Sequence, residues 1–301
     1  MEHYLPPGEY HYLSRNFTHR QHHPGGIEFL LAMIFSHFPL PKDCNQQKAN
    51  EWKDCMNPAF IDRFSYYTQF HQALAYKTET EHYMRFRGRL TDSGEGNTMC
   101  ALYWQLNDVW AAPTWSSVDW DLKWKPAHYE ARRFFAKYVI VLFFNDNDLV
   151  EAFVVNDNNF VVEGVEVKIS ALAYSNGFEP IFTSVSRVDL PPLSSIPVNI
   201  EQHKMNETLE GFKKEHKLRD GGEEFVFTGT MHSSNQQQLG YTATLIASKL
   251  YHVNLDDTST VSVQSLKKIS QLEYELDLRA PGIGASALTL PAEECAEHKD
   301  G

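Results

Sequence analysis

Residues 101–115, with the sequence ALYWQLNDVWAAPTW, combine three indole rings with the adjacent polar pair Asn107 and Asp108. The stretch holds half of the six tryptophans of the chain. An indole face can pack against the C–H face of a sugar ring, and neighbouring amide and carboxylate groups can bind its hydroxyls. Because a hexose presents an apolar face and a polar edge, these residue types at this spacing favour carbohydrate contact.

Ordinary core packing is the alternative, since tryptophan is commonly buried and usually finds a partner for its ring N–H. For any single tryptophan, packing in the core is the better interpretation. The cluster beside the polar pair favours sugar contact instead, and the following loop adds indoles that can wall a pocket, at positions 115, 120 and 124. The candidate substrate-binding residues are Trp104, Asn107, Asp108 and Trp110.

The elements around this cluster are two helices and a strand. An Asn-Pro pair and three-to-four spacing of apolar residues predict a helix over residues 57–89, and a second helix is expected over residues 126–139. Between them, the apolar run of residues 98–106 has the length of a buried strand. This order is typical of one repeat of an α/β barrel or sheet. Residues 105–108 would then lie at the carboxyl end of a barrel strand, where α/β barrels build their active sites.

From about residue 145 the hydrophobic period changes to two. In residues 164–174, for example, every second side chain from Val165 to Ala173 is apolar. Such alternating strands, separated by Gly, Pro and Asn turns, predict a β-sandwich. The charged stretch 206–222 is expected to be a loop, and 189–199 an extended connector or edge. The other expected strands lie within residues 223–232, 240–253 and 271–279.

Composition limits the function classes. With 301 residues, 42% apolar and 22% charged, the chain is expected to be globular, with two domains or slightly more. Its net charge of -12 argues against nucleic-acid binding, and no apolar run is long enough to span a membrane. The four cysteines show neither CxxC nor zinc-finger spacing, although Cys44 and Cys55 could pair. No cofactor is predicted.

Glycosylation sequons and a cluster of histidines are two further signals in the sequence. The start has no basic and apolar regions of a signal peptide, but glycosylation sequons at Asn16 and Asn206 favour a secreted chain whose true N-terminus lies upstream. His19, His22 and His23 could suggest a metal site. The Pro-Gly-Gly that follows indicates a loop rather than the helix that such spacing needs. We therefore interpret these histidines as a polar loop near a pocket or as plain surface, and predict no metal.

Four blocks of the sequence resemble the β-mannosidases, the animal lysosomal type of glycoside hydrolase family 2. The resemblance is strong over residues 14–140 and weak over the strand-rich remainder. The blocks come in the family's order, and YWQLND is the most specific part. They are HRQHHPGG, YKTETEHYMR, MCALYWQLNDVWAAPTWSS and KWKPAHYEARRFFA.

The resemblance implies a multidomain protein with a (β/α)8 barrel followed by two β-sandwich domains, placed in the lysosome. It implies retaining hydrolysis of terminal, non-reducing β-D-mannose residues, and mannose-containing oligosaccharides as partners. Such hydrolysis needs two carboxylic acids about 5 Å apart, a nucleophile and an acid/base. In the family both are glutamates on the fourth and seventh barrel strands, which are expected upstream of Met1. Glu9 follows two prolines and is not expected to be the nucleophile.

The expected fold class is therefore α/β plus all-β. Residues 1–140 would form the incomplete C-terminal part of the barrel, 141–237 an immunoglobulin-like or carbohydrate-binding-like sandwich, and 238–301 the start of a second sandwich. By resemblance, Trp104 is the platform under the sugar, and Asn107 and Asp108 lie beside it. The chain alone is expected to be inactive. The alternative function is a non-catalytic carbohydrate-binding or interaction protein.

Overall fold

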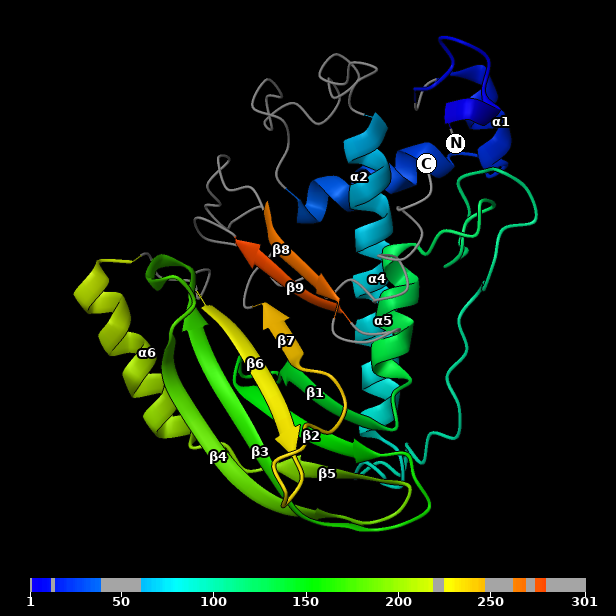
Figure 1. The fold of residues 1–301 in the computed structure, drawn as a ribbon. Coiled ribbons are helices and arrows are strands. Elements are labelled where there is room, and N and C mark those ends of the chain that lie inside the picture. The colour runs from blue at the N-terminus through cyan, green and yellow to red at the C-terminus, as the bar shows by residue number, and fades with distance from the viewer. Residues whose placement is uncertain are drawn as a thin grey trace.

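The computed structural model describes residues 2–11, 14–38, 61–218, 225–246, 262–268 and 274–279. Within these ranges, helices dominate the first part of the chain and antiparallel strands the second (Figure 1). The α-helices are α1 (Arg15–Gln21), α2 (Gly26–His37), α4 (Ile61–Arg85), α5 (Pro126–Phe134) and α6 (Gln202–His216). The strands are β1 (Tyr138–Phe144), β2 (Val150–Asn156), β3 (Val162–Ala173), β4 (Pro180–Leu190), β5 (Ser194–Val198), β6 (Phe225–His232), β7 (Ala243–Ile246), β8 (Ser262–Lys268) and β9 (Tyr274–Arg279).

Helix α4 is the longest of the described helices, and both α2 and α5 pack against it. The predicted helix over 57–89 is confirmed from Ile61 to Arg85, while residues 57–60 lie outside the described ranges, as do Cys44 and Cys55. The first half of α4 packs against α2, where Phe64 is buried with Leu31 and Ile34. Because aromatic and branched side chains at helical spacing share one face, this contact closes a small separate core.

The expected strand over residues 98–106 is not present as a strand. This segment runs extended and is drawn without an arrow in Figure 1. Among the described residues, no backbone N–H group donates a hydrogen bond to a carbonyl oxygen of residues 99–104. The backbone N–H groups of residues 99–104 donate no backbone hydrogen bond either. A strand assignment requires a partner ladder, so an extended apolar run without one remains coil.

Helix α5 is shorter than the expected helix over 126–139. It ends at Phe134, and the chain enters β1 at Tyr138. The β1 sequence YVIVLFF is rich in β-branched and aromatic residues, which favour strands over helix. Both faces of this strand are covered, so its apolar run is continuous rather than alternating. Ile140 and Leu142 face the sandwich core, whereas Val139 and Val141 pack towards Met84 at the end of α4.

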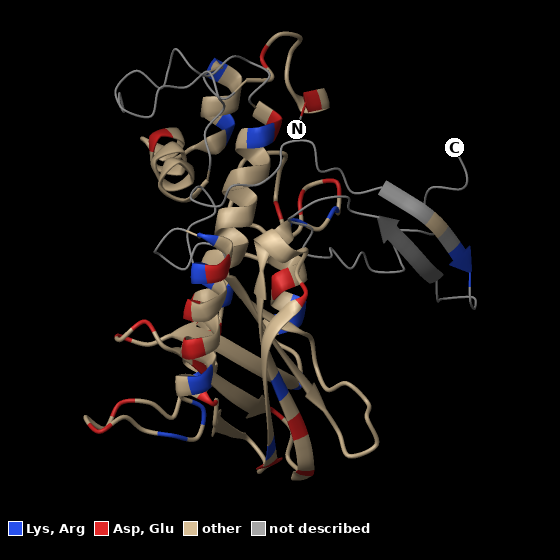
Figure 2. Cartoon of the chain, turned by 90° about the vertical axis from the view of Figure 1, so that its left-hand side faces the viewer, with Lys and Arg blue, Asp and Glu red and all other residues tan. Residues whose placement is uncertain are grey.

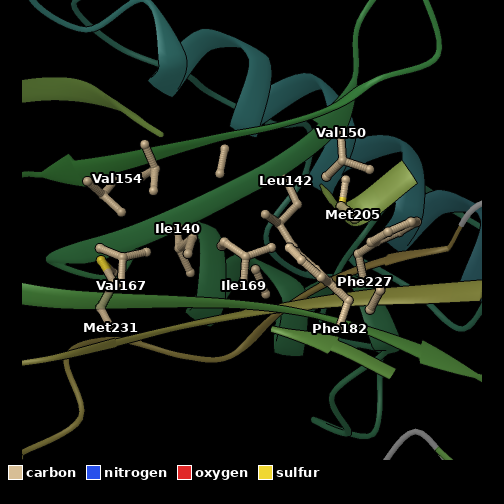
Figure 3. Packing of buried hydrophobic residues seen from close by; sticks show 14 of the residues in the cluster. Ile140, Leu142, Val150, Val154, Val167, Ile169, Phe182, Met205, Phe227 and Met231 are labelled. Atoms are coloured by element: carbon tan, nitrogen blue, oxygen red, sulfur yellow. The ribbon is translucent and has the colours of Figure 1, made fainter. Parts of the chain in front are cut away.

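Seven of the nine described strands, β1 to β7, form two antiparallel sheets that pack face to face. One sheet has the order β1-β2-β5 and the other β4-β3-β6-β7. The alternation predicted for β3 is confirmed, because Val165, Val167, Ile169, Ala171 and Ala173 all lie in the shared core. Figure 3 shows Val167 and Ile169 close to Ile140 of the first sheet, with Met231 of the second sheet beside Val167. Residues 194–198, expected as an edge, form the edge strand β5.

The charged region 206–222 was wrongly predicted as a loop, because most of it belongs to α6. Met205 and Leu209, four residues apart on one helical face, reach the sandwich core, and Phe212 packs beside them. Figure 1 places α6 along the sheet beside β4. The polar residues between these anchors face solvent. Three apolar side chains are enough to hold a polar helix on the apolar face of a sheet. In the sequence, however, so few apolar residues are only a weak indication of a helix.

The last predicted strands are confirmed within the described residues, except that residues 240–242 precede the start of β7. Strand β6 covers residues 225–232 of the predicted 223–232, and β7 covers 243–246 of the predicted 240–253. Strand β9 covers 274–279 and pairs with β8 in a separate two-stranded sheet. Residues 223–224, 247–253 and 271–273 lie outside the described ranges. Because β7 pairs with β6, the expected domain boundary at 237/238 falls inside one sheet.

Three arginines, the last residue of α4 and two that follow it, dock the helical part on the outer face of the β1-β2-β5 sheet. The Arg85 guanidinium carbon lies 3.6 Å from the ring centroid of Phe143, and that of Arg89 lies 4.4 Å from Phe153. Arg87 forms an ion pair of 2.9 Å with Asp157. Guanidinium groups stack well on aromatic faces, so this interface combines cation–π stacking with an ion pair.

The surface charge of α4 is mixed. Figure 2 shows acidic and basic positions interspersed along its second half rather than gathered into one basic stripe. Within the described residues, no helix is both long and apolar enough to cross a bilayer.

We predict that Gly229→Ala destabilises the sandwich. A Cβ at this position would lie 2.7 Å from Ile140 Cδ1 and 3.3 Å from Ile169 Cδ1, where the two sheets approach each other. Overpacking of this kind costs about 1–3 kcal/mol. The free energy of unfolding should fall by that amount in urea denaturation. Gly211→Ala in α6 is the matched control, since it meets no atom within 4 Å and should stabilise the helix. Equal stability of the Gly229→Ala variant and the parent chain would contradict this account.

We also predict that the α2–α4 contact weakens as pH falls. Burial, and then the nearby His37, lower the pKa of His71 from its usual value of 6.5. The ring centroids of His37 and His71 are 4.7 Å apart. The unfolded chain therefore binds a proton at higher pH than the folded chain, so stability is lost as pH falls through about 6.5 and below. The melting temperature should drop between neutral pH and about pH 5, and less steeply in His71→Gln.

His203→Gln is the control for this pH series, because His203 lies exposed on α6 away from the helical core. It should leave the pH dependence of the melting temperature unchanged. An identical slope for His71→Gln and the parent chain would contradict the prediction.

Candidate functional site

The segment 99–106 has two different faces. Leu102 and Trp104 are 87% and 70% exposed, and Leu106 also faces out. Tyr103 and Gln105, between them, are half-buried towards the helices. The Tyr103 ring lies 5.3 Å from that of Tyr76 on α4. One face of the segment is therefore anchored on helices, while the other presents a row of exposed apolar side chains.

Trp104 is held through its backbone. The Tyr76 hydroxyl donates a hydrogen bond of 2.5 Å to the Trp104 carbonyl oxygen. On α4, Gln72 donates to the carbonyl oxygen of Trp115 at 2.8 Å, and Gln105 N–H donates to the same oxygen at 3.3 Å. The peptide bond between Trp104 and Gln105 is cis. The indole of Trp104 is therefore exposed on a backbone that α4 fixes from behind.

Asn107 and Trp110 lie on the loop that follows. Asn107 is exposed, and its side-chain amide donates to the carbonyl oxygen of Asp108 at 3.0 Å. Its amide oxygen and second amide hydrogen form no hydrogen bond with the described residues and are open to a ligand. Trp110 is half-buried, with His22 edge-on at 5.2 Å between ring centroids and the Arg20 guanidinium at 5.3 Å. Arg20 also donates to the Ala111 carbonyl oxygen at 2.7 Å.

Asp108 differs from its neighbours because it is buried. One carboxylate oxygen accepts a hydrogen bond from Thr114, and the other lies 3.6 Å from the Lys125 ammonium. Lys125 also donates to Ser116 at 2.6 Å. Burial lowers the pKa of Lys125, and the adjacent Asp108 partly opposes that shift. Sequence analysis did not single out Lys125, because a lysine directly before a helical proline has no spacing that marks it as buried.

The histidine segment lies against the tryptophans. His22 follows the last turn of α1 in a left-handed conformation and contacts Trp110. The His23 ring lies 6.3 Å from that of Trp115. His19 is in α1, 5.1 Å from His22. Among the described residues, no group of three or more His, Cys, Asp or Glu side chains is arranged to hold a metal ion.

The remaining tryptophans of the loop do not share one role. Trp115 and Trp120 are both exposed. Trp124 does not wall this surface as expected, because its ring packs against His128 and Tyr129 of α5, at 4.3 and 5.3 Å between centroids. An indole two residues before the first residue of a helix is well placed to cover its first turn, and packing there competes with exposure to a ligand.

Glu9 lies beside α1 rather than beside the tryptophans. Its carboxylate accepts a hydrogen bond of 3.2 Å from the backbone N–H of Asn16, in the first turn of that helix. A negative side chain at this end is favourable because the first helical N–H groups have no helical partners. This contact gives Glu9 a structural role.

A groove of about 590 Å³ runs along α4 and is separate from the tryptophan surface. His37, His71 and Tyr83 are among the side chains that line it, and none of the described tryptophans does. The exposed indole of Trp104 therefore belongs to an open surface rather than to this groove.

Sequence comparisons relate the chain to one class of proteins. It is 36% identical over 282 residues to a probable beta-mannosidase of Caenorhabditis elegans, covering 92% of this chain and 30% of that protein. It is 46% identical over 132 residues to the beta-mannosidase of Mus musculus, covering 44% of this chain and 14% of that protein. The chain thus spans less than a third of the length of either relative. No protein-family model matches it.

One solved structure shares the fold of this chain. The crystal structure of a beta-D-mannosidase from Dictyoglomus thermophilum superimposes with a TM-score of 0.66 and 20% identity, over 90% of this chain and 28% of that one. At this identity the match supports the arrangement of helices and antiparallel sheets.

Proposed function

Because this chain is related to the β-mannosidases over part of their length, we propose that it supplies a sugar-contacting portion of a β-mannosidase-type glycosidase. The reaction of the whole protein would be retaining hydrolysis of terminal, non-reducing β-D-mannose residues. The observation that carries this proposal is the exposed indole of Trp104 on a segment anchored from behind by α4.

The two-faced segment supports a barrel strand as the finer interpretation. In a (β/α)8 barrel, one face of each strand meets the outer helices and the other points into the barrel. Tyr103 faces α4 and α5, whereas Leu102 and Trp104 point away from them. Backbone groups of residues 99–104 that lack partners in the described structure would pair with the neighbouring strands of a complete barrel. Residues 98–106 would then be its last strand.

The domain division that we propose follows the sheets. The barrel portion would extend to about residue 137, and an immunoglobulin-like sandwich would cover residues 138–246. Strands β8 and β9 would belong to a further β unit. The second boundary would lie beyond Ile246 rather than at 237/238, because β7 pairs with β6 in one sheet.

Three of the four candidate residues suit direct contact with a mannose ring. Trp104 would be the platform under the C–H face, and Asn107 would bind a hydroxyl through its free amide groups. Trp110, steadied by His22 and Arg20, would form a side wall. The mammalian relatives also lead us to propose the lysosome as the place of action.

We predict that the chain binds mannose and that Trp104→Ala weakens this binding by about tenfold or more, equivalent to about 1.4 kcal/mol. The loss is expected because the exposed indole provides the apolar contact area. Isothermal titration calorimetry with mannose would measure it. Phe160→Ala is the control, since Phe160 is also an exposed aromatic residue but lies in the sandwich region. Binding heat that ignores Trp104 would count against the platform.

We predict that the 301-residue chain does not turn over a chromogenic β-mannoside. Retaining hydrolysis needs two carboxylic acids about 5 Å apart. The carboxylate nearest in sequence to Trp104, Asp108, is buried and bound to Thr114 and Lys125, so it cannot reach an anomeric carbon. A rate near that of a complete β-mannosidase would overturn the prediction.

A further inference from the structure

Asp108 and Lys125 form a buried ion pair within the tryptophan loop. Their side chains are 2% and 10% exposed, and the nearest nitrogen and oxygen are 3.6 Å apart. A buried charge is tolerated when it is paired and hydrogen-bonded. Both conditions are met here, because Thr114 donates to Asp108 and Lys125 donates to Ser116.

The pair closes a loop around the indoles. Asp108 stands at the start of the loop, and Lys125 stands at its end, immediately before the first turn of α5. Thr114 and Ser116 lie between them, and their hydroxyl groups are 3.1 Å apart. Backbone hydrogen bonds also connect both ends of the loop to its middle. Lys125 N–H donates to the carbonyl oxygen of Ser117, and Asp108 N–H donates to that of Val118. The chain that carries Trp110 and Trp115 is therefore fixed at both ends and in the middle.

The other surface residues of the loop are not held in this way. Asn107 is exposed, and its side-chain amide donates a hydrogen bond to the adjacent backbone carbonyl of Asp108. Asp108, by contrast, uses both carboxylate oxygens inside the protein. A side chain that is 2% exposed and has two internal partners is not presented to a ligand.

We propose that Asp108 is a positioning residue that acts through Lys125, Thr114 and Ser116 to hold Trp110 and Trp115 in place for a hexose ligand. The nature of the ligand rests on the proposed function, whereas the positioning of the indoles does not. This role replaces the direct sugar contact expected for Asp108 from sequence. It also gives Lys125 a function that its sequence context does not indicate.

The test uses the full chain labelled with 5-fluorotryptophan, with fluorine resonances assigned by single Trp→Phe variants. In the absence of sugar, Asp108→Asn and Lys125→Met should each shift the resonances of Trp110 and Trp115. Trp104 should move least, because Tyr76 on α4 holds its backbone. Mannose binding should then weaken by about threefold or more.

A second buried lysine–carboxylate pair provides the matched control. Lys77 and Glu81 on α4 are 2.7 Å apart and largely buried, outside the loop. Lys77→Met should leave the Trp110 and Trp115 resonances and the mannose affinity unchanged. Loop resonances that shift equally in both pairs would show general destabilisation and would overturn the proposal.

Thr114→Val guards against variants that fail to fold. It removes a hydrogen bond to Asp108 without leaving a buried charge unpaired, so the helical part should remain folded. It should shift the same two resonances by a smaller amount. Far-ultraviolet circular dichroism checks that the fold is retained.

The outcomes separate this proposal from the proposed function. If Asp108→Asn weakens mannose binding but leaves the resonances of the free chain unchanged, Asp108 contacts the sugar directly and the positioning role is wrong. If the resonances shift while the parent chain itself binds no mannose, the positioning role holds and the sugar-contacting function fails. Unchanged resonances in Asp108→Asn, Lys125→Met and Thr114→Val would overturn the proposal in every case.

Discussion

The packing of α4 against three different partners is the constraint on which the rest of the described structure depends. Near its start, Phe64 joins Leu31 and Ile34 of α2 in a buried apolar cluster. In its middle, Tyr76 holds the backbone of Trp104. At its end, Arg85 stacks on Phe143 of the sandwich. A helix is stiff over this length, so these contacts transmit one alignment from the small helical core to the sheets.

The tryptophan surface follows from this arrangement because it has no core of its own. The segment 99–106 and the loop after it contain little regular structure and depend on side chains of α4 and on internal polar contacts. Where hydrophobic packing is sparse, buried polar groups must form hydrogen bonds with one another. Each of these hydrogen bonds then helps to fix the position of the loop. The Asp108–Lys125 pair is the clearest example, with Thr114 and Ser116 completing it. Binding loops on a rigid scaffold commonly have this character.

The sequence predicted the structure correctly where one hydrophobic period runs through the whole segment. In β3 the alternation from Val165 to Ala173 identified the buried face residue by residue, because a strand has only two faces. The same logic failed for α6, whose anchors Met205 and Leu209 are outnumbered by polar neighbours. It also failed for residues 98–106, where apolar content predicted a strand, because strand formation needs hydrogen-bonding partners that the described chain does not place there.

For the candidate site, the sequence alone determined which residues are suited to a hexose: the indoles of Trp104 and Trp110 and the amide of Asn107. It also determined that this cluster follows an apolar extended run between two helices. Only the tertiary structure decided that Asp108 is buried, that Lys125 is its partner, and that Trp124 packs on α5. The physical reason is that residue type sets what a side chain can bind, whereas burial and pairing depend on residues up to 17 positions away that folding brings together.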